Sequence, residues 1–211
     1  MKDSGVAGAQ VITDRGQWVK IIGPKVPEAA RRVQQGPHLL AGRFIADYYI
    51  TEGQFLHICG GDGGLEQALQ KGFIELTDVH ITALYPKEEV AAKARERIRA
   101  AKHDERISCK VGNVYDLPFE EGSFDAIAGV GPILLWGERE QGMKEIYRVL
   151  RTGGVARIGG RFIHMPEWRK TSSETLRASA AKTGISSIRV IDDMGQWVEI
   201  RKGIKDRGLR D

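Results

Sequence analysis

The sequence predicts an α/β domain with a seven-stranded, mostly parallel sheet, helices on both faces and an antiparallel last strand. Two observations lead to this fold class. From residue 55 onward, short apolar runs such as FDAIAGV at 124–130 alternate with segments of helical periodicity, which is typical of parallel strands joined by helices. Near the C-terminus, only residues 192–195 separate the last two strands. A link this short cannot cross over, so those two strands must be antiparallel.

The apolar runs locate the strands in chain order. The expected strands cover residues 17–22, 55–59, 79–85, 107–111, 124–130, 155–163, 187–191 and 196–200. The expected helices cover residues 27–49, 65–71, 87–102, 138–150 and 166–183. The helix at 87–102 is well marked, because acidic residues begin it and basic residues end it, as the helix dipole favours. Gly153 and Gly154 end the helix at 138–150.

Two domain-level expectations follow. Residues 1–50 are predicted to be an N-terminal extension of a strand and helices, with a flexible start over 1–15 and a role as a lid; residues 51–211 are predicted to be the main domain. The tetrapeptide Gly-Gln-Trp-Val occurs twice, beginning at Gly16 and at Gly195. We interpret this repeat as a coincidence, since nothing around it suggests a repeat architecture.

Composition excludes several classes of protein. The 211 residues are 41% hydrophobic and 28% charged, which fits one globular α/β domain. The net charge of +4 comes from scattered basic residues, so nucleic-acid binding is not favoured. The two cysteines, Cys59 and Cys109, lack zinc-ligand spacing, so neither a metal nor a disulfide is expected. No apolar segment resembles a signal peptide or a membrane span, and we expect a cytoplasmic protein.

A glycine-rich turn is the first functional signal. Residues 55–64 read FLHICGGDGG, an apolar strand that runs into a turn dense in glycine. Glycine there permits unusual backbone angles and lets a ligand approach the main chain. The turn opens at the carboxyl edge of the sheet, where α/β proteins bind ligands and helix N-termini favour anionic groups. A tight connection without a ligand is the alternative interpretation.

Three later segments, taken in order, make the first signal more specific. They are GNVYDLPF at 112–119, GSFD at 122–125 and RVLRTGG at 148–154. Together they resemble the class I S-adenosylmethionine-dependent methyltransferases, in particular the small-molecule branch of the ubiquinone and menaquinone type. The resemblance covers about residues 52–165. It implies a Rossmann-like fold, S-adenosylmethionine as cofactor and methyl transfer to a small, partly apolar metabolite.

The resemblance also implies which residues contact the cofactor. Four of these residues depart from the family pattern. His57 replaces an acid in the strand at 55–59, and Cys59 stands where the family's glycine triplet begins. Tyr85 stands at the ribose-binding acid, and Asn113 replaces the aspartate that contacts adenine. Asp78 is an alternative ribose ligand if its strand ends early. An amide at Asn113 can still accept a hydrogen bond. The full implied set is His57, Cys59, Gly60, Gly61, Asp62, Gly63, Tyr85, Asn113, Val114 and Gly131.

Methyl transfer from a sulfonium is an in-line displacement, so the protein mainly has to align the acceptor with the methyl carbon. The acceptor is expected above the strands at 124–130 and 155–163, near the apolar run at 133–136. His164 follows the strand at 155–163 and is the candidate general base. The candidate acceptor-binding residues are Tyr48, Trp136, Arg161 and Trp168.

Other functions remain open at this point. The departures at His57, Tyr85 and Asn113 also fit a non-catalytic protein of the same fold that binds a partner. The string GGDGG at 60–64 resembles spermidine synthases, but residues 129–136 carry no acids to hold a polyamine, so aminopropyl transfer ranks lower. Residues 131–134 (GPIL) do not match the NPPY-like tetrapeptide of enzymes that methylate base nitrogens. A homodimer also remains open.

Overall fold

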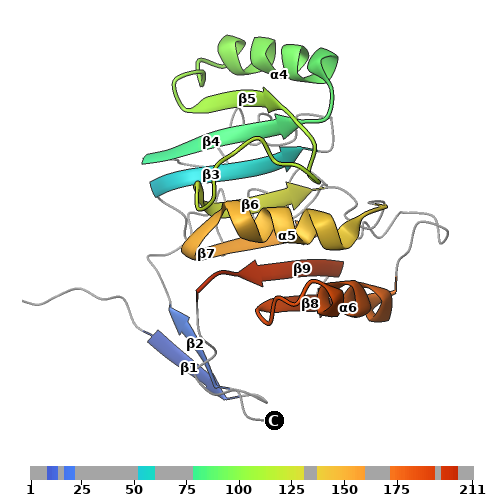
Figure 1. The fold of residues 1–211 in the computed structure, drawn as a ribbon. Coiled ribbons are helices and arrows are strands. Elements are labelled where there is room, and N and C mark those ends of the chain that lie inside the picture. The colour runs from blue at the N-terminus through green and yellow to red at the C-terminus, as the bar shows by residue number, and fades with distance from the viewer. Residues whose placement is uncertain are drawn as a thin grey trace, which may run out of the picture.

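The computed structural model describes residues 9–13, 17–21, 52–59, 78–130, 137–159, 172–192 and 196–203. At their centre is one sheet of seven strands in the order β5-β4-β3-β6-β7-β9-β8 (Figure 1). Strand β9 runs antiparallel to both β7 and β8, and the other neighbours in the sheet are parallel. The predicted fold class is therefore confirmed. The strands are β3 (Glu52–Cys59), β4 (Asp78–Tyr85), β5 (Ile107–Val111), β6 (Phe124–Val130), β7 (Leu150–Gly159), β8 (Ile188–Asp192) and β9 (Gln196–Arg201).

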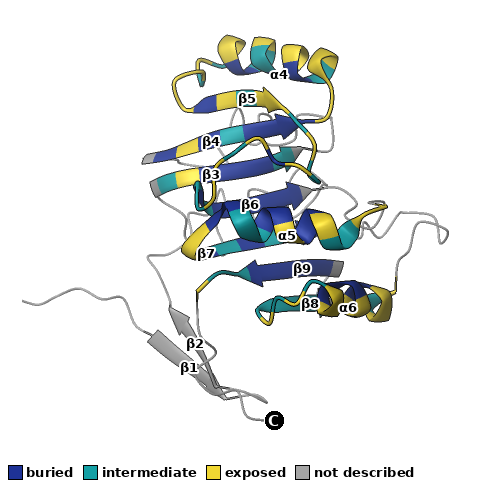
Figure 2. Ribbon diagram, viewed as in Figure 1, coloured by how far each residue is buried: buried dark blue, intermediate teal, exposed yellow. Residues whose placement is uncertain are grey.

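Helices cover both faces of this sheet. They are α4 (Glu88–Ala100), α5 (Arg139–Val149) and α6 (Ser173–Lys182). Ala83 and Tyr85 of β4 pack with alanines of α4, whereas Leu84 between them belongs to the cluster that includes Met143 and Ile146 of α5. Successive strand residues point to opposite faces, so α4 and α5 lie on opposite sides. Figure 2 shows the central strands largely buried between these layers and the outer side of α4 exposed.

Most element boundaries agree with the sequence pattern, although β3 begins at Glu52 rather than at residue 55 and α6 begins at Ser173 rather than at residue 166. A further difference, at β7, is informative. Strands β5 and β6 have the predicted bounds, but β7 begins at Leu150 rather than at residue 155. The chain passes directly from α5 into β7, and the pairing of β6 with β7 shifts register between Phe124 and Ala126. Gly153, with φ of +89°, lies inside β7. The glycines that appeared to end the helix instead permit an irregular start to the strand.

The N-terminal residues contain a β-hairpin, which corrects the expectation of a flexible start over residues 1–15. Strands β1 (Ala9–Thr13) and β2 (Gln17–Ile21) pair antiparallel in a two-stranded sheet of their own. The β-branched residues Val11 and Ile12 favour a strand, and the three residues at 14–16, which include a glycine, suit a hairpin connection.

The repeated tetrapeptide lies in corresponding places of this strand pair and of the pair formed by β8 and β9. The sequences of residues 9–22 and 188–201 align without a gap, and the two strand pairs have the same register. Ile12 pairs with Trp18 in the first, and Ile191 pairs with Trp197 in the second. The similarity therefore extends beyond the tetrapeptide to both strands of each pair. The shared residues, written as pairs, are Val11/Val190, Ile12/Ile191, Asp14/Asp193, Gly16/Gly195, Gln17/Gln196, Trp18/Trp197, Val19/Val198 and Ile21/Ile200.

The amino edge of the sheet, opposite the predicted ligand edge, is fixed by Asp125. Its Oδ2 accepts the backbone N–H of Gln54 at 2.9 Å, and its Oδ1 pairs with Nη1 of Arg151 at 2.7 Å. Gly53 has φ of +97°, and a Cβ built on it would lie 2.5 Å from Oδ2 of Asp125. Only glycine fits beside this carboxylate.

We therefore expect Gly53→Ala to lower the free energy of unfolding by about 3 kcal/mol, from left-handed backbone strain and a displaced carboxylate. Urea unfolding measures the change. Gly153→Ala is the matched control, because Gly153 has φ of +89° but a Cβ there meets nothing within 4 Å. The control should lose only the strain energy, about 1–2 kcal/mol. Equal losses in the two variants would show that the carboxylate contact is unimportant.

Candidate functional site

Four parallel strands end side by side at one edge of the sheet. Tyr85 at the end of β4 is in register with Val111 of β5, and Cys59 at the end of β3 is in register with Val130 of β6. The predicted cofactor residues that the structure describes therefore lie on, or directly after, the ends of neighbouring strands. The remaining predicted cofactor residues, the acceptor-binding residues and the candidate base lie outside the described residues. They are Gly60, Gly61, Asp62, Gly63 and Gly131 for the cofactor, Tyr48, Trp136, Arg161 and Trp168 for the acceptor, and His164 as the base.

His57 and Tyr85 are both buried at this edge. His57 is 4% exposed and lies in register with Ala83 of β4 and Ala128 of β6. The Tyr85 side chain is fully buried in the cluster beneath α4. β4 continues from Asp78 to Tyr85, so Asp78 lies at the opposite edge of the sheet. It is therefore not the alternative ribose ligand. Contact of His57 and Tyr85 with a cofactor stays a prediction.

Asn113 lies just past the end of β5 in a tight turn. Its Oδ1 accepts the backbone N–H of Tyr115 at 3.1 Å, and it forms an isolated bridge with Asp116. Since a backbone N–H requires an acceptor, this bond fixes which end of the amide is oxygen. The residue is exposed, while Val114 next to it packs against the main core cluster. The turn thus presents an oriented amide and an apolar side chain at the carboxyl edge.

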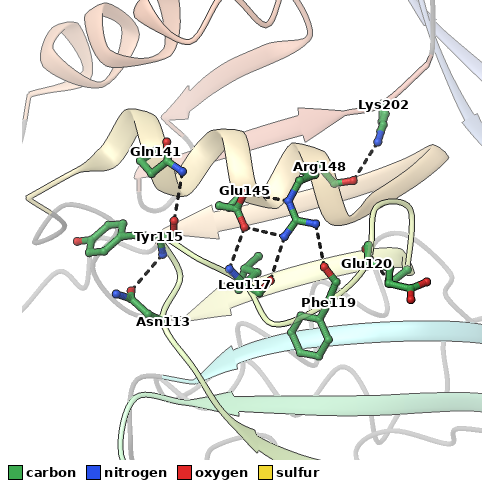
Figure 3. Close-up of polar contacts among 10 residues, drawn as sticks. Asn113, Tyr115, Leu117, Phe119, Glu120, Gln141, Glu145, Arg148 and Lys202 are labelled. Atoms are coloured by element: carbon green, nitrogen blue, oxygen red, sulfur yellow. Dashed lines mark hydrogen bonds and ion pairs between the residues drawn. The ribbon is translucent and has the colours of Figure 1, made fainter.

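The segment after this turn is held from α5 by an ion pair (Figure 3). Glu145 Oε2 accepts the backbone N–H of Leu117 at 2.8 Å and pairs with Nη2 of Arg148 at 2.7 Å. Arg148 donates Nη2 to the carbonyl of Leu117 at 2.9 Å and Nη1 to the carbonyl of Phe119 at 2.8 Å. Glu145 is 9% exposed. The pair therefore supplies charged partners to the Leu117 N–H and to two loop carbonyls, of which that of Leu117 also accepts the Phe119 N–H at 2.7 Å.

Electrostatics reinforce this arrangement. The hydrogen bonds from Arg148 lower the pKa of Glu145, with a further contribution from the Leu117 N–H. In turn, Glu145 raises the pKa of Arg148. Glu145 and Arg148 therefore both remain charged near neutral pH. Separately, the backbone carbonyl of Arg148, near the end of α5, accepts a hydrogen bond from Nζ of Lys202 at 3.0 Å.

Sequence reasoning placed Arg148 in a family motif but did not identify Glu145 or the contact between the two motifs. The available signal was an acid three residues before an arginine on the apolar side of a helix, where an unpaired carboxylate is costly. The contact joins the LPF segment at 117–119 to the RVL segment at 148–150. The order of the motifs along the chain gave no indication that they touch.

Residues 55–154 match the methyltransferase-domain family. A structure from Methanococcus maripaludis, assigned as an S-adenosyl-L-methionine-dependent methyltransferase, is 27% identical with a TM-score of 0.68, covering 85% of this chain and 89% of that one. Residues 55–154, a little under half of the chain, are thus similar to a methyltransferase domain. This confirms the family resemblance, and S-adenosylmethionine is the cofactor that these matches assign to the domain. The family match extends from β3 into β7, so it includes the glycine-rich turn, the Asn113 turn and the Glu145–Arg148 pair.

Two curated relatives of the domain are named as methyltransferases of quinone biosynthesis or of a hydroquinone. A ubiquinone/menaquinone biosynthesis C-methyltransferase of Geotalea daltonii is 32% identical over 106 residues, covering 50% of this chain and 44% of that protein. A 2-methyl-6-phytyl-1,4-hydroquinone methyltransferase of Oryza sativa is 32% identical over 123 residues, covering 58% and 33%. The chain thus spans less than half the length of these two relatives. In the part of the chain that the structure describes, no helix is long and apolar enough to cross a membrane.

Proposed function

We propose that this protein is an enzyme that transfers a methyl group from S-adenosylmethionine to a small, partly apolar acceptor. The observation that carries the proposal is the fixed turn at Asn113 and Val114, held at the carboxyl edge where β3, β4 and β5 end. Ligands of open α/β sheets bind outside this edge. The matches to quinone and quinol methyltransferases support an acceptor with an apolar ring system.

In this proposal, the cofactor lies along the strand ends. Cys59, Gly60, Gly61, Asp62 and Gly63 approach its amino-acid part, with His57 and Gly131 nearby. The end of β4 at Tyr85 lies on the ribose side, while the Tyr85 side chain packs beneath α4. Asn113 hydrogen-bonds to the adenine while Val114 packs on the ring. The bound cofactor supplies an activated methyl group, so the chain's own residues only have to orient the reactants and exclude water.

The acceptor is proposed to lie beyond β6 and β7. Tyr48, Trp136, Arg161 and Trp168 would contact it, and His164 would remove a proton where the acceptor carries one. A cytoplasmic location, a homodimer and residues 1–50 as a lid stay predictions. A non-catalytic binding protein remains the second candidate, because Tyr85 is buried where the family has an acid.

Calorimetric titration with S-adenosylhomocysteine and S-adenosylmethionine tests the proposal. We expect one ligand per chain and a Kd raised about tenfold by Asn113→Ala, the loss of roughly one hydrogen bond. Asp104→Ala, an exposed loop residue outside the predicted site, is the control and should leave the Kd unchanged. If neither ligand bound at millimolar concentration, the proposed methyltransferase activity would be refuted and the non-catalytic candidate favoured.

A further inference from the structure

We propose that α5 positions the cofactor-binding turn through a ladder of three side chains, Gln141, Glu145 and Arg148, and that this ladder sets cofactor affinity. The inference rests on the proposed function, since it takes the turn at Asn113 and Val114 to be the adenine site. None of the three residues is required to touch the cofactor. They are positioning residues that act through the backbone of residues 115–119.

The ladder connects one face of α5 to the backbone of a turned loop. Gln141 Nε2 donates to the carbonyl of Tyr115 at 3.2 Å. The ion pair described above binds the N–H and carbonyl of Leu117 and the carbonyl of Phe119. The three helix residues are spaced four and three apart, which places them on one face. The loop residues are spaced two apart in a segment that turns, since the Phe119 N–H donates to the carbonyl of Leu117 at 2.7 Å.

These contacts are made to backbone groups, so they fix the path of the loop and not only its packing. The carbonyls of three alternate loop residues bond to α5, as Figure 3 shows. Tyr115 joins the ladder to the turn directly, because its carbonyl is held by Gln141 while its N–H is bonded to Oδ1 of Asn113. Loss of the hydrogen bond from Gln141 to Tyr115 is therefore transmitted to the Asn113 amide, which is proposed to bind adenine.

Gln141 gives the cleanest test, because it is exposed and contributes nothing to the core. We expect Gln141→Ala to raise the Kd for S-adenosylhomocysteine about fivefold, as a weak hydrogen bond is lost. The stoichiometry and the Tm should not change. Lys144→Ala, also exposed on α5, is the matched control and should bind like the wild type. Gln141→Lys retains an N–H donor and should restore binding to within about twofold.

Arg148→Lys tests the other end of the ladder. It retains the positive charge but loses the planar fork that reaches two carbonyls at once. We expect a Kd raised about tenfold or more for the folded fraction, which calorimetric stoichiometry measures separately. A purely structural role would instead lower the stoichiometry and the Tm while leaving the Kd at its wild-type value.

The outcomes separate the two claims. If the wild type binds S-adenosylhomocysteine and both ladder variants bind it with an unchanged Kd, the ladder inference is wrong and the proposed function stands. If the wild type itself does not bind at millimolar ligand, the proposed function and the inference fall together. A raised Kd in Gln141→Ala, with rescue by Gln141→Lys, is the result that the ladder predicts.

Discussion

Replacing Tyr85 by aspartate is expected to lower the free energy of unfolding by about 4 kcal/mol or more at pH 7. The family has an acid at this position, so the substitution restores the residue type that the family pattern has there. In this chain, however, the Tyr85 side chain is fully buried against Ala83, Ala91 and Ala94 beneath α4. The smaller residue leaves a cavity there, and its carboxylate loses its hydration.

The charge part of this loss depends on pH. Burial raises the pKa of the new carboxyl above its unfolded value of about 3.9. The destabilisation should therefore grow as pH rises above that value and shrink toward pH 3. Urea unfolding at pH 7 and at pH 4 measures it, with Tyr85→Phe as the control that preserves volume. If Tyr85→Asp kept wild-type stability and bound S-adenosylhomocysteine more tightly, position 85 would belong to the ribose site and not to the core.

Replacing Glu145 by alanine is expected to lower the free energy of unfolding by about 3 kcal/mol at pH 7, because the Arg148 guanidinium and the Leu117 N–H both lose their partner. Thermal or urea unfolding measures the loss. Lys144→Ala, the neighbouring exposed residue, is the control and should change stability by less than about 0.5 kcal/mol. A loss as small as that of the control would show that the ion pair contributes nothing.

The same residue predicts how stability responds to acid. Since Arg148 lowers the pKa of Glu145 in the folded state, the stabilisation is fully present above the unfolded pKa of about 4.3. It is lost as pH falls through the lower, folded pKa. The difference in unfolding free energy between the wild type and Glu145→Gln should therefore shrink as pH is lowered below about 4.3. A difference that stays constant down to pH 2 would contradict this ionised role.

Local sequence signals were sufficient for the sheet. Strands β5 and β6 were located exactly because a turn bounds each apolar run, and the short link at 192–195 fixed the direction of β9 relative to β8. The start of β7 was missed because glycines at 153 and 154 are as consistent with a helix end as with a bulged strand. The second strand of the N-terminal hairpin was predicted at 17–22, but the first was missed because residues 1–10 are polar and rich in glycine.

The site was harder to predict than the fold. The order of the motifs indicated a methyltransferase, and the topology places Asn113 and Tyr85 at one edge, as the resemblance implied. The burial of Tyr85 depends on how α4 packs, and the Glu145–Leu117 contact joins residues 28 positions apart. Neither follows from periodicity, because both depend on tertiary packing that sequence spacing does not encode.

A crystal structure with S-adenosylhomocysteine bound is the most direct test of the account. It should show the adenine within hydrogen-bonding distance of Asn113, Val114 against the ring, and the sulfur beside the turn at 60–64. Occupancy of a different surface, or an adenine that contacts neither Asn113 nor Val114, would contradict the placement of the cofactor on which the proposed function depends.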